Sequence, residues 1–143
     1  MKKFLILLGI TFAIAVVPTF FVNFNTSDLI KPMFFPKDIV FPIAWSILYL
    51  LMTISLYITT KKDNELYPIY FAQLIVNAIW TPLFFGFKLY LFSFLWIILL
   101  IVLVIMMTYK MFMKNKVSAY LQIPYILWLL FAMYLNLAIY LLN

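Results

Sequence analysis

The stretch Ala72-Gln-Leu-Ile-Val-Asn-Ala-Ile-Trp-Thr-Pro-Leu-Phe-Phe-Gly86 combines an apolar segment with a polar stripe. Two amides and two aromatic rings recur at steps of four, three and four residues, at Gln73, Asn77, Trp80 and Phe84. On a helix, this spacing places all of them on one face. Because a side-chain amide in hydrocarbon costs free energy unless it finds a partner, we expect the stripe to face other helices or a cavity.

The composition is that of an integral membrane protein. Of the 143 residues, 69% are hydrophobic, 21% aromatic and 10% charged, against roughly 45–50% apolar and 25% charged residues in soluble domains. A soluble chain of this length could not bury so much apolar surface. The net charge of +6 does not indicate nucleic acid as a partner, because the lysines lie at the ends of apolar segments, where they meet lipid headgroups.

Five apolar segments are each long enough to cross a membrane, whose hydrocarbon core is roughly 30 Å thick. The expected helices span residues 4–22, 42–60, 66–87, 89–113 and 118–142. The predicted fold is all-α integral membrane, a five-transmembrane-helix bundle that forms a single domain over residues 1–143. Pro82 should kink or end the third helix, and Pro124 lies inside the fifth.

Residues 23–41 form a long connection that is rich in aromatic side chains. A solvated linker would not need these side chains, so we expect the loop to fold onto the membrane end of the bundle. Seven lysines lie on the side of the N-terminus and three on the side of this loop. The positive-inside rule therefore predicts a multi-pass protein of the cell membrane with a cytoplasmic N-terminus, and with the C-terminus and loop 23–41 outside.

The residue types that the chain lacks exclude several kinds of binding and catalytic site. The chain has no cysteine and no histidine, which removes disulfides, thiolate nucleophiles, the usual zinc sites and histidine-ligated haem. No ionisable residue lies in the middle of an expected span, which counts against a proton pump or an ion-coupled transporter but leaves a passive carrier open. We expect no metal site, no required cofactor and no conventional side-chain catalysis.

Aromatic side chains are the remaining candidates for a binding site. Trp45 and Tyr49 share a face of the second expected helix, and Trp128 and Phe131 lie on the fifth. Aromatic faces with a few amide donors suit a flat, largely apolar, conjugated ligand. The alternative is that these rings only line the bundle or form an interfacial belt.

The sequence allows two interpretations for each of two pairs of polar residues. Asn77 and Asn136 could bond to each other or to backbone as interhelical contacts worth roughly 0.6–2 kcal/mol, or Asn77 could donate to a ligand. Lys31 and Lys37 in the loop could pair with ligand carboxylates at the membrane surface. The simpler interpretation is that they are solvated lysines that help to set the topology.

Four segments resemble the translocator protein family, also called TspO/MBR, tryptophan-rich sensory proteins or peripheral benzodiazepine receptors. They are Lys31-Pro32 with Pro36, Trp45-Ser-Ile-Leu-Tyr49, Gln73 to Gly86, and Pro124 to Asn136. Their order and spacing agree with the family over nearly the whole chain. A match of four segments in register is far more specific than a match of any one of them.

The resemblance implies a five-helix bundle, often dimeric, with a ligand pocket that opens toward the first loop. Family members bind porphyrins such as protoporphyrin IX and haem, and benzodiazepine-site ligands; some bind cholesterol, and some promote light-dependent porphyrin breakdown. By motif position, Trp45 and Trp128 would be the catalytic residues if this chain is photochemically active. Tyr49, Asn77 and Ala132 fall at pocket-lining positions.

Two features depart from the family pattern. The loop reads Phe34-Phe-Pro36-Lys37 where the family usually has Trp-x-Pro-Pro, so one tryptophan and one proline are missing. The chain ends Tyr140-Leu-Leu-Asn143 without the basic residue of the cholesterol motif. Cholesterol binding at that site is therefore not supported.

These observations predict a membrane protein that binds a tetrapyrrole, protoporphyrin IX or haem, inside the bundle, with the homodimer that the resemblance implies. The expected ligand-binding residues are Trp45, Tyr49, Gln73, Asn77, Trp80, Phe84, Trp128, Phe131, Ala132, Lys31 and Pro36. Two other functions are open. One is a passive transporter of porphyrin or another apolar metabolite, and the other is a scaffold or stress sensor that acts through a protein partner.

Overall fold

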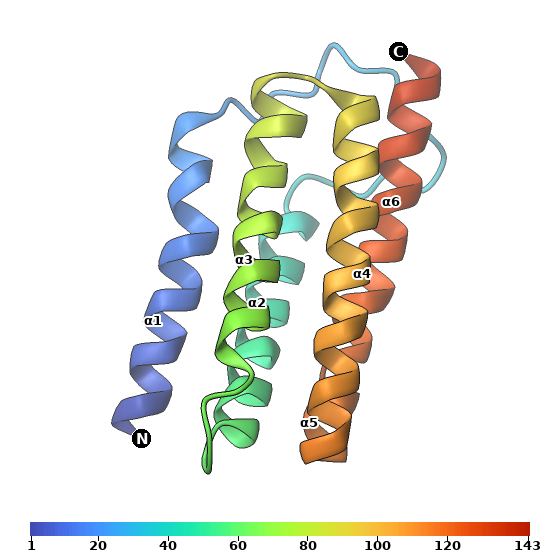
Figure 1. Ribbon diagram of the computed structural model, residues 1–143. Helices are drawn as coiled ribbons and strands as arrows, with labels where there is room; N and C mark the ends of the chain where they lie inside the picture. The colour runs from blue at the N-terminus through green and yellow to red at the C-terminus, as the bar shows by residue number, and fades with distance from the viewer.

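The computed structural model describes all 143 residues and forms a bundle of helices (Figure 1). The elements are α1 Lys2–Val16 with a 3₁₀ turn at Val17–Phe21, α2 Val40–Thr59, α3 Tyr67–Thr81 with a π-helical turn at Pro82–Gly86, α4 Tyr90–Lys114, α5 Lys116–Tyr120 and α6 Ile123–Leu142. They make five segments of 20 to 27 residues that are long and apolar enough to cross a membrane. The expected all-α, five-span membrane fold is confirmed.

The helices pack in a defined order around the core. α1 packs against α2 and α3, and α4 packs against α3 and α6. The N-terminus, the α2–α3 turn and α5 lie at one end of the bundle, and the C-terminus lies at the other (Figure 1). Large apolar side chains stay exposed on the outer faces, among them Ile6, Ile47, Ile75, Leu99 and Leu127. Lipid hydrocarbon is the solvent that suits such a surface.

Two prolines lie where the helices are interrupted, one after the end of α3 and one in the first turn of α6. α3 ends at Thr81, and Pro82 begins the π-helical turn. The prediction of one continuous helix over 118–142 is wrong, because α5 ends at Tyr120 and a turn precedes α6. Pro124 has no N–H to donate to the carbonyl four residues earlier, so the helix breaks and restarts with this proline in its first turn.

The connection between α1 and α2 is held against α6. The Ile30 backbone exchanges two hydrogen bonds of 3.0 Å with the side chain of Asn143. The Tyr134 hydroxyl donates to the Met33 carbonyl at 2.9 Å. These contacts hold the loop against the C-terminal part of α6, at the end of the bundle that carries the C-terminus (Figure 1).

Candidate functional site

The polar stripe of α3 lies inside the bundle, as its spacing predicts. Gln73, Asn77 and Phe84 are buried, and Trp80 is half-buried. The rings of Trp80 and Phe84 stack at 5.3 Å between centroids, and Phe84 also contacts the Tyr90 ring at 5.2 Å. Phe84 thus packs between α3 and α4 at one end of the stripe.

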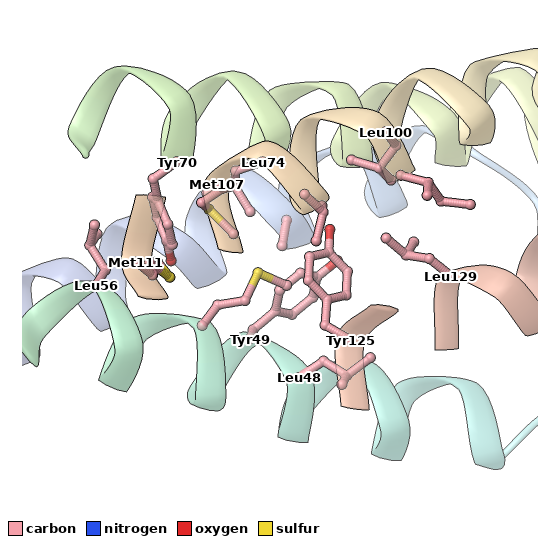
Figure 2. Packing of buried hydrophobic residues seen from close by; sticks show 14 of the residues in the cluster. Leu48, Tyr49, Leu56, Tyr70, Leu74, Leu100, Met107, Met111, Tyr125 and Leu129 are labelled. Carbon is pink, nitrogen blue, oxygen red and sulfur yellow. The ribbon is translucent and has the colours of Figure 1, made fainter. Parts of the chain in front are cut away.

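A chain of hydrogen bonds connects α2, α3 and α6 in the middle of the bundle. The Asn77 amide donates to the Tyr125 hydroxyl at 2.7 Å, and this hydroxyl donates to Gln73 Oε1 at 2.8 Å. The Tyr49 hydroxyl donates to Asn77 Oδ1 at 3.3 Å. Figure 2 shows Tyr49 and Tyr125 close together in the buried cluster. The two amides of the α3 stripe, Gln73 and Asn77, which would be costly in hydrocarbon, are therefore paired.

Asn136, the buried asparagine of α6, has a different partner from the one considered in the sequence. Asn136 accepts a hydrogen bond from the Trp80 indole at 3.2 Å and donates to the Ala132 carbonyl at 2.7 Å. It does not bond to Asn77. The longer Tyr125 and Trp80 side chains reach across between α3 and α6, so each asparagine pairs with an aromatic residue of the facing helix.

Five rings form a continuous path of contacts from the loop to the core, which we call the aromatic file. Its members in order are Phe35, Phe41, Trp128, Trp45 and Tyr49. Successive centroids lie 5.8, 6.1, 6.3 and 5.5 Å apart. The innermost pair is stacked with 23° between planes, and the Trp45–Trp128 pair is edge-to-face. The file brings together rings from the loop, α2 and α6.

The outer end of the aromatic file is cationic. Lys31 Nζ lies 5.0 Å from the centroid of the Phe35 ring. Pro36 follows this ring in the chain and is half-buried, whereas Lys37 is exposed. Phe131 lies beside the file, with its ring 5.7 Å from that of Trp128.

The Trp128 indole N–H is buried and has no hydrogen-bond partner. Nearly all buried donors in folded proteins are paired, because an unpaired one costs about 1–3 kcal/mol. This donor lies where the rings of α2 and α6 meet. The aromatic file contains two indoles, Trp45 and Trp128. Only the Trp128 nitrogen is both buried and without a hydrogen-bond partner.

A small cavity lies next to the hydrogen-bond chain. Its volume is about 10 Å³, and its lining residues are Trp45, Asn77, Trp80, Ile97, Leu100, Leu129 and Ala132. This volume holds about one water molecule, whereas ligand pockets measure about 300–1,000 Å³. The site is therefore closed, and a ligand the size of a porphyrin enters only if the surrounding side chains and helices separate.

Several residues of the site were missed in the sequence. They are Ile97 and Leu100 on α4, and Tyr125 and Leu129 on α6. The α6 residues carried a signal, because Tyr125, Leu129, Ala132 and Asn136 recur at the same steps as the stripe of α3. The α4 residues carried none, because α4 is apolar on all sides and its inward face has no distinguishing residue type.

The fold and the site together define a class of protein: a five-span α-helical membrane protein whose bundle encloses an aromatic, amide-lined site. Residues 5–142 match the TspO/MBR family, and the chain belongs to this family. The resemblance carried by the four motifs is confirmed.

Relatives of the chain come from archaea, bacteria and yeast. A tryptophan-rich protein TspO of Archaeoglobus fulgidus is 40% identical over 117 residues, which cover 79% of this chain and 76% of that protein. Protein CrtK of Rhodobacter capsulatus is 34% identical over 122 residues, or 81% and 76% of the two chains. A translocator protein homolog of Schizosaccharomyces pombe is 31% identical over 121 residues, or 79% and 74%.

Proposed function

We propose that this protein binds a tetrapyrrole, such as protoporphyrin IX or haem, against the aromatic file. The observation that carries the proposal is the unpaired, buried indole N–H of Trp128, whose ring lies edge-to-face with Trp45 at 6.3 Å. A ligand that brings an acceptor to this donor removes its desolvation penalty. The flat faces of the two indoles suit a conjugated ring.

The outer end of the file suits the carboxylates of such a ligand. Lys31 lies above Phe35 at the loop end of the bundle, where an ammonium group can meet a propionate at the membrane surface. The apolar ring system would then extend inward along the file toward Trp128. This arrangement keeps charge in the aqueous interface and the conjugated ring among aromatic side chains.

Binding requires the site to open from about 10 Å³ to several hundred. Two irregular points lie on the helices that would have to move. α3 continues into the π-helical turn Pro82–Gly86, and α6 is separated from α5 by a turn at residues 121–122. Such breaks in the hydrogen-bond ladder are where helices bend. We infer that α3 and α6 separate at these points to admit the ring.

A cavity-filling variant tests the location of the ligand. Leu100 lines the cavity and is 1% exposed, whereas its neighbour Leu99 points outward and is 43% exposed. In an absorbance titration with protoporphyrin IX in the dark, Leu100→Phe should weaken binding at least about tenfold, or 1.4 kcal/mol, and Leu99→Phe should not. Equal affinities in the two folded variants would place the ligand elsewhere. If Leu100→Phe misfolds, Ala132→Leu fills the same cavity with a smaller group.

The same site suits a light-dependent breakdown of the bound porphyrin. The ring would be the photosensitiser, the indoles of Trp45 and Trp128 would be its electron or radical partners, and the protein would supply orientation. Replacing both with Phe should abolish the loss of porphyrin absorbance under light while substantial dark binding remains. Equal rates of loss in the double variant and the wild type would refute the photochemical role.

A passive transporter of the same ligand is the second candidate, and the two irregular points on α3 and α6 favour it. Porphyrin flux into liposomes should then depend on the site, and Asn77→Leu should slow it because Asn77 lines the cavity. A flux that is unaffected by this change would remove the site from the route. A scaffold or sensor that acts through a protein partner instead predicts no saturable porphyrin binding at all.

The distribution of lysines bears on the orientation of the protein in the membrane. We propose a cytoplasmic N-terminus, because seven of the ten lysines lie at that end of the bundle, and a homodimer in the bilayer. The chain has no cysteine, so single cysteines report orientation without background labelling. A membrane-impermeant thiol reagent applied to intact cells should label Lys37→Cys and spare Lys62→Cys, and the reverse pattern would invert the topology.

A further inference from the structure

α1 packs beside α3 (Figure 1), and an open groove lies between these two helices near the N-terminus. Its volume is about 500 Å³, within the usual range for ligand sites of about 300–1,000 Å³. The aromatic file runs from the loop to the core, and none of its five residues lines this groove. Ile6, Ile10 and Phe71 are among the apolar residues that line the groove. It is therefore a separate feature from the proposed porphyrin site.

The two ends of the groove differ in chemistry. Its rim consists of Lys2, Lys3 and Tyr67. Below the rim, the Tyr67 and Phe71 rings stack with 15° between planes and 6.2 Å between centroids, which makes a flat aromatic wall. Opposite this wall, Ile6 is 52% exposed. A cationic rim above a long apolar wall fits an amphipathic ligand with an anionic head and a hydrocarbon tail.

The positive charge of the rim is not neutralised within the chain. Lys2 makes no hydrogen bond or ion pair, and Lys3 Nζ donates only to the Thr60 carbonyl at 2.6 Å. The nearby acidic residues of the α2–α3 turn, Asp63 and Glu65, are both paired with Lys114 at 2.7 and 3.0 Å. An ammonium group has three donors, so both rim lysines keep donors for an anionic group.

We infer that the α1–α3 groove binds an anionic phospholipid. The phosphate lies between the Lys2 and Lys3 ammonium groups, the Tyr67 hydroxyl donates to the headgroup region, and an acyl chain follows the apolar wall. Basic pockets between membrane helices are suited to anionic headgroups, and each lysine near such a surface contributes about a fivefold gain in affinity. Tyrosine is enriched at the membrane–water interface, where its ring lies in hydrocarbon and its hydroxyl lies among the headgroups.

Charge favours an anionic occupant of this groove. Seven of the ten lysines lie at this end of the bundle, and no carboxylate of the chain pairs with the two rim lysines. An anionic lipid supplies the missing counter-charge.

Native mass spectrometry of the purified protein tests this inference. The protein in detergent is titrated with phosphatidylglycerol or with phosphatidylcholine of the same acyl chains, and retained lipid is counted. Wild type should retain phosphatidylglycerol preferentially, and Lys2→Gln/Lys3→Gln should lower its affinity about thirtyfold. The matched double variant Lys110→Gln/Lys116→Gln removes the same charge from the same end outside the groove and should lose less than threefold. Equal losses, or equal binding of the two lipids, would overturn the inference.

A second pair of variants tests the apolar wall without changing any charge. Ile6→Trp fills the groove, whereas Ile105→Trp adds the same ring to an exposed site on α4. Only the first should weaken retention of phosphatidylglycerol, by about tenfold or more. If the wild type is instead a lipid-free dimer that Ile6→Trp dissociates, the groove is an interface between copies and the inference is wrong. The assay uses no porphyrin, so its result is independent of the proposed function.

Discussion

Removing the Tyr125 hydroxyl should destabilise the bundle without leaving a void. The side chain is 1% exposed, and Tyr125→Phe deletes only its oxygen. This oxygen accepts from Asn77 at 2.7 Å and donates to Gln73 at 2.8 Å. The change therefore leaves one amide donor and one amide acceptor without partners in the middle of the membrane-spanning region.

The size of the effect follows from these two bonds. Interhelical hydrogen bonds in membrane proteins are worth about 0.6 kcal/mol on average and about 1.7 at most. Two such bonds give about 1.2 kcal/mol, with an upper limit of about 3.4. Because the ring stays in place, the packing contribution hardly changes. We expect Tyr125→Phe to lower the free energy of unfolding by about 1–3 kcal/mol.

The assay is reversible unfolding in mixed micelles with increasing dodecyl sulfate, followed by circular dichroism. Tyr120→Phe is the matched control, because Tyr120 is 58% exposed and its hydroxyl makes no hydrogen bond. It should change the free energy by less than about 0.5 kcal/mol, as is usual for surface sites. A Tyr125→Phe protein as stable as the Tyr120→Phe protein would refute the role given to the hydrogen-bond chain.

Two further predictions concern the charged ends of the bundle. Lys31→Gln should weaken protoporphyrin IX binding about two- to fivefold, which is the range that an exposed ion pair contributes. Lys37→Gln should leave the dissociation constant unchanged in the same titration. Equal dissociation constants for the two variants would show that Lys31 is not part of the site. The hydrogen bond from Lys114 lowers the pKa of Asp63 below its ordinary value of 3.8. The ionised Asp63 carboxylate therefore stabilises the fold fully at pH values above its ordinary pKa, and this stabilisation is lost as the pH falls through the lowered pKa. The difference in melting temperature between wild type and Asp63→Asn should be constant from neutral pH to about pH 5. It should disappear in stronger acid. A difference that grows on acidification would contradict this sign.

The inward direction of the α3 stripe could be predicted from the sequence because the cost of burying amides in hydrocarbon leaves few alternatives. Gln73 and Asn77 are buried for this reason. Their partners could not be predicted in the same way. Which hydroxyl reaches Asn77 depends on the separation and rotation of α2, α3 and α6, and periodicity within a single helix contains no information about either quantity.

The break in the last span illustrates a different limit. Pro124 fits the first turn of a helix as well as a kink inside one, so its position alone does not distinguish a continuous helix over 118–142 from two helices. The closed state of the site was equally hidden. The composition predicts an aromatic lining, but the volume between rings is set by how Trp45, Trp80 and their neighbours pack.

The measurement that tests the central claim most directly is a dark titration of the purified protein with protoporphyrin IX, followed by tryptophan fluorescence. Wild type is compared with Trp45→Phe/Trp128→Phe and with Trp96→Phe, whose indole donates to the Val76 carbonyl at 2.7 Å outside the aromatic file. We predict saturable, stoichiometric quenching in wild type and Trp96→Phe that is largely lost in the double variant. Linear, unsaturated quenching that is equal for each remaining tryptophan would mean that the porphyrin only partitions into the micelle, and would contradict the account.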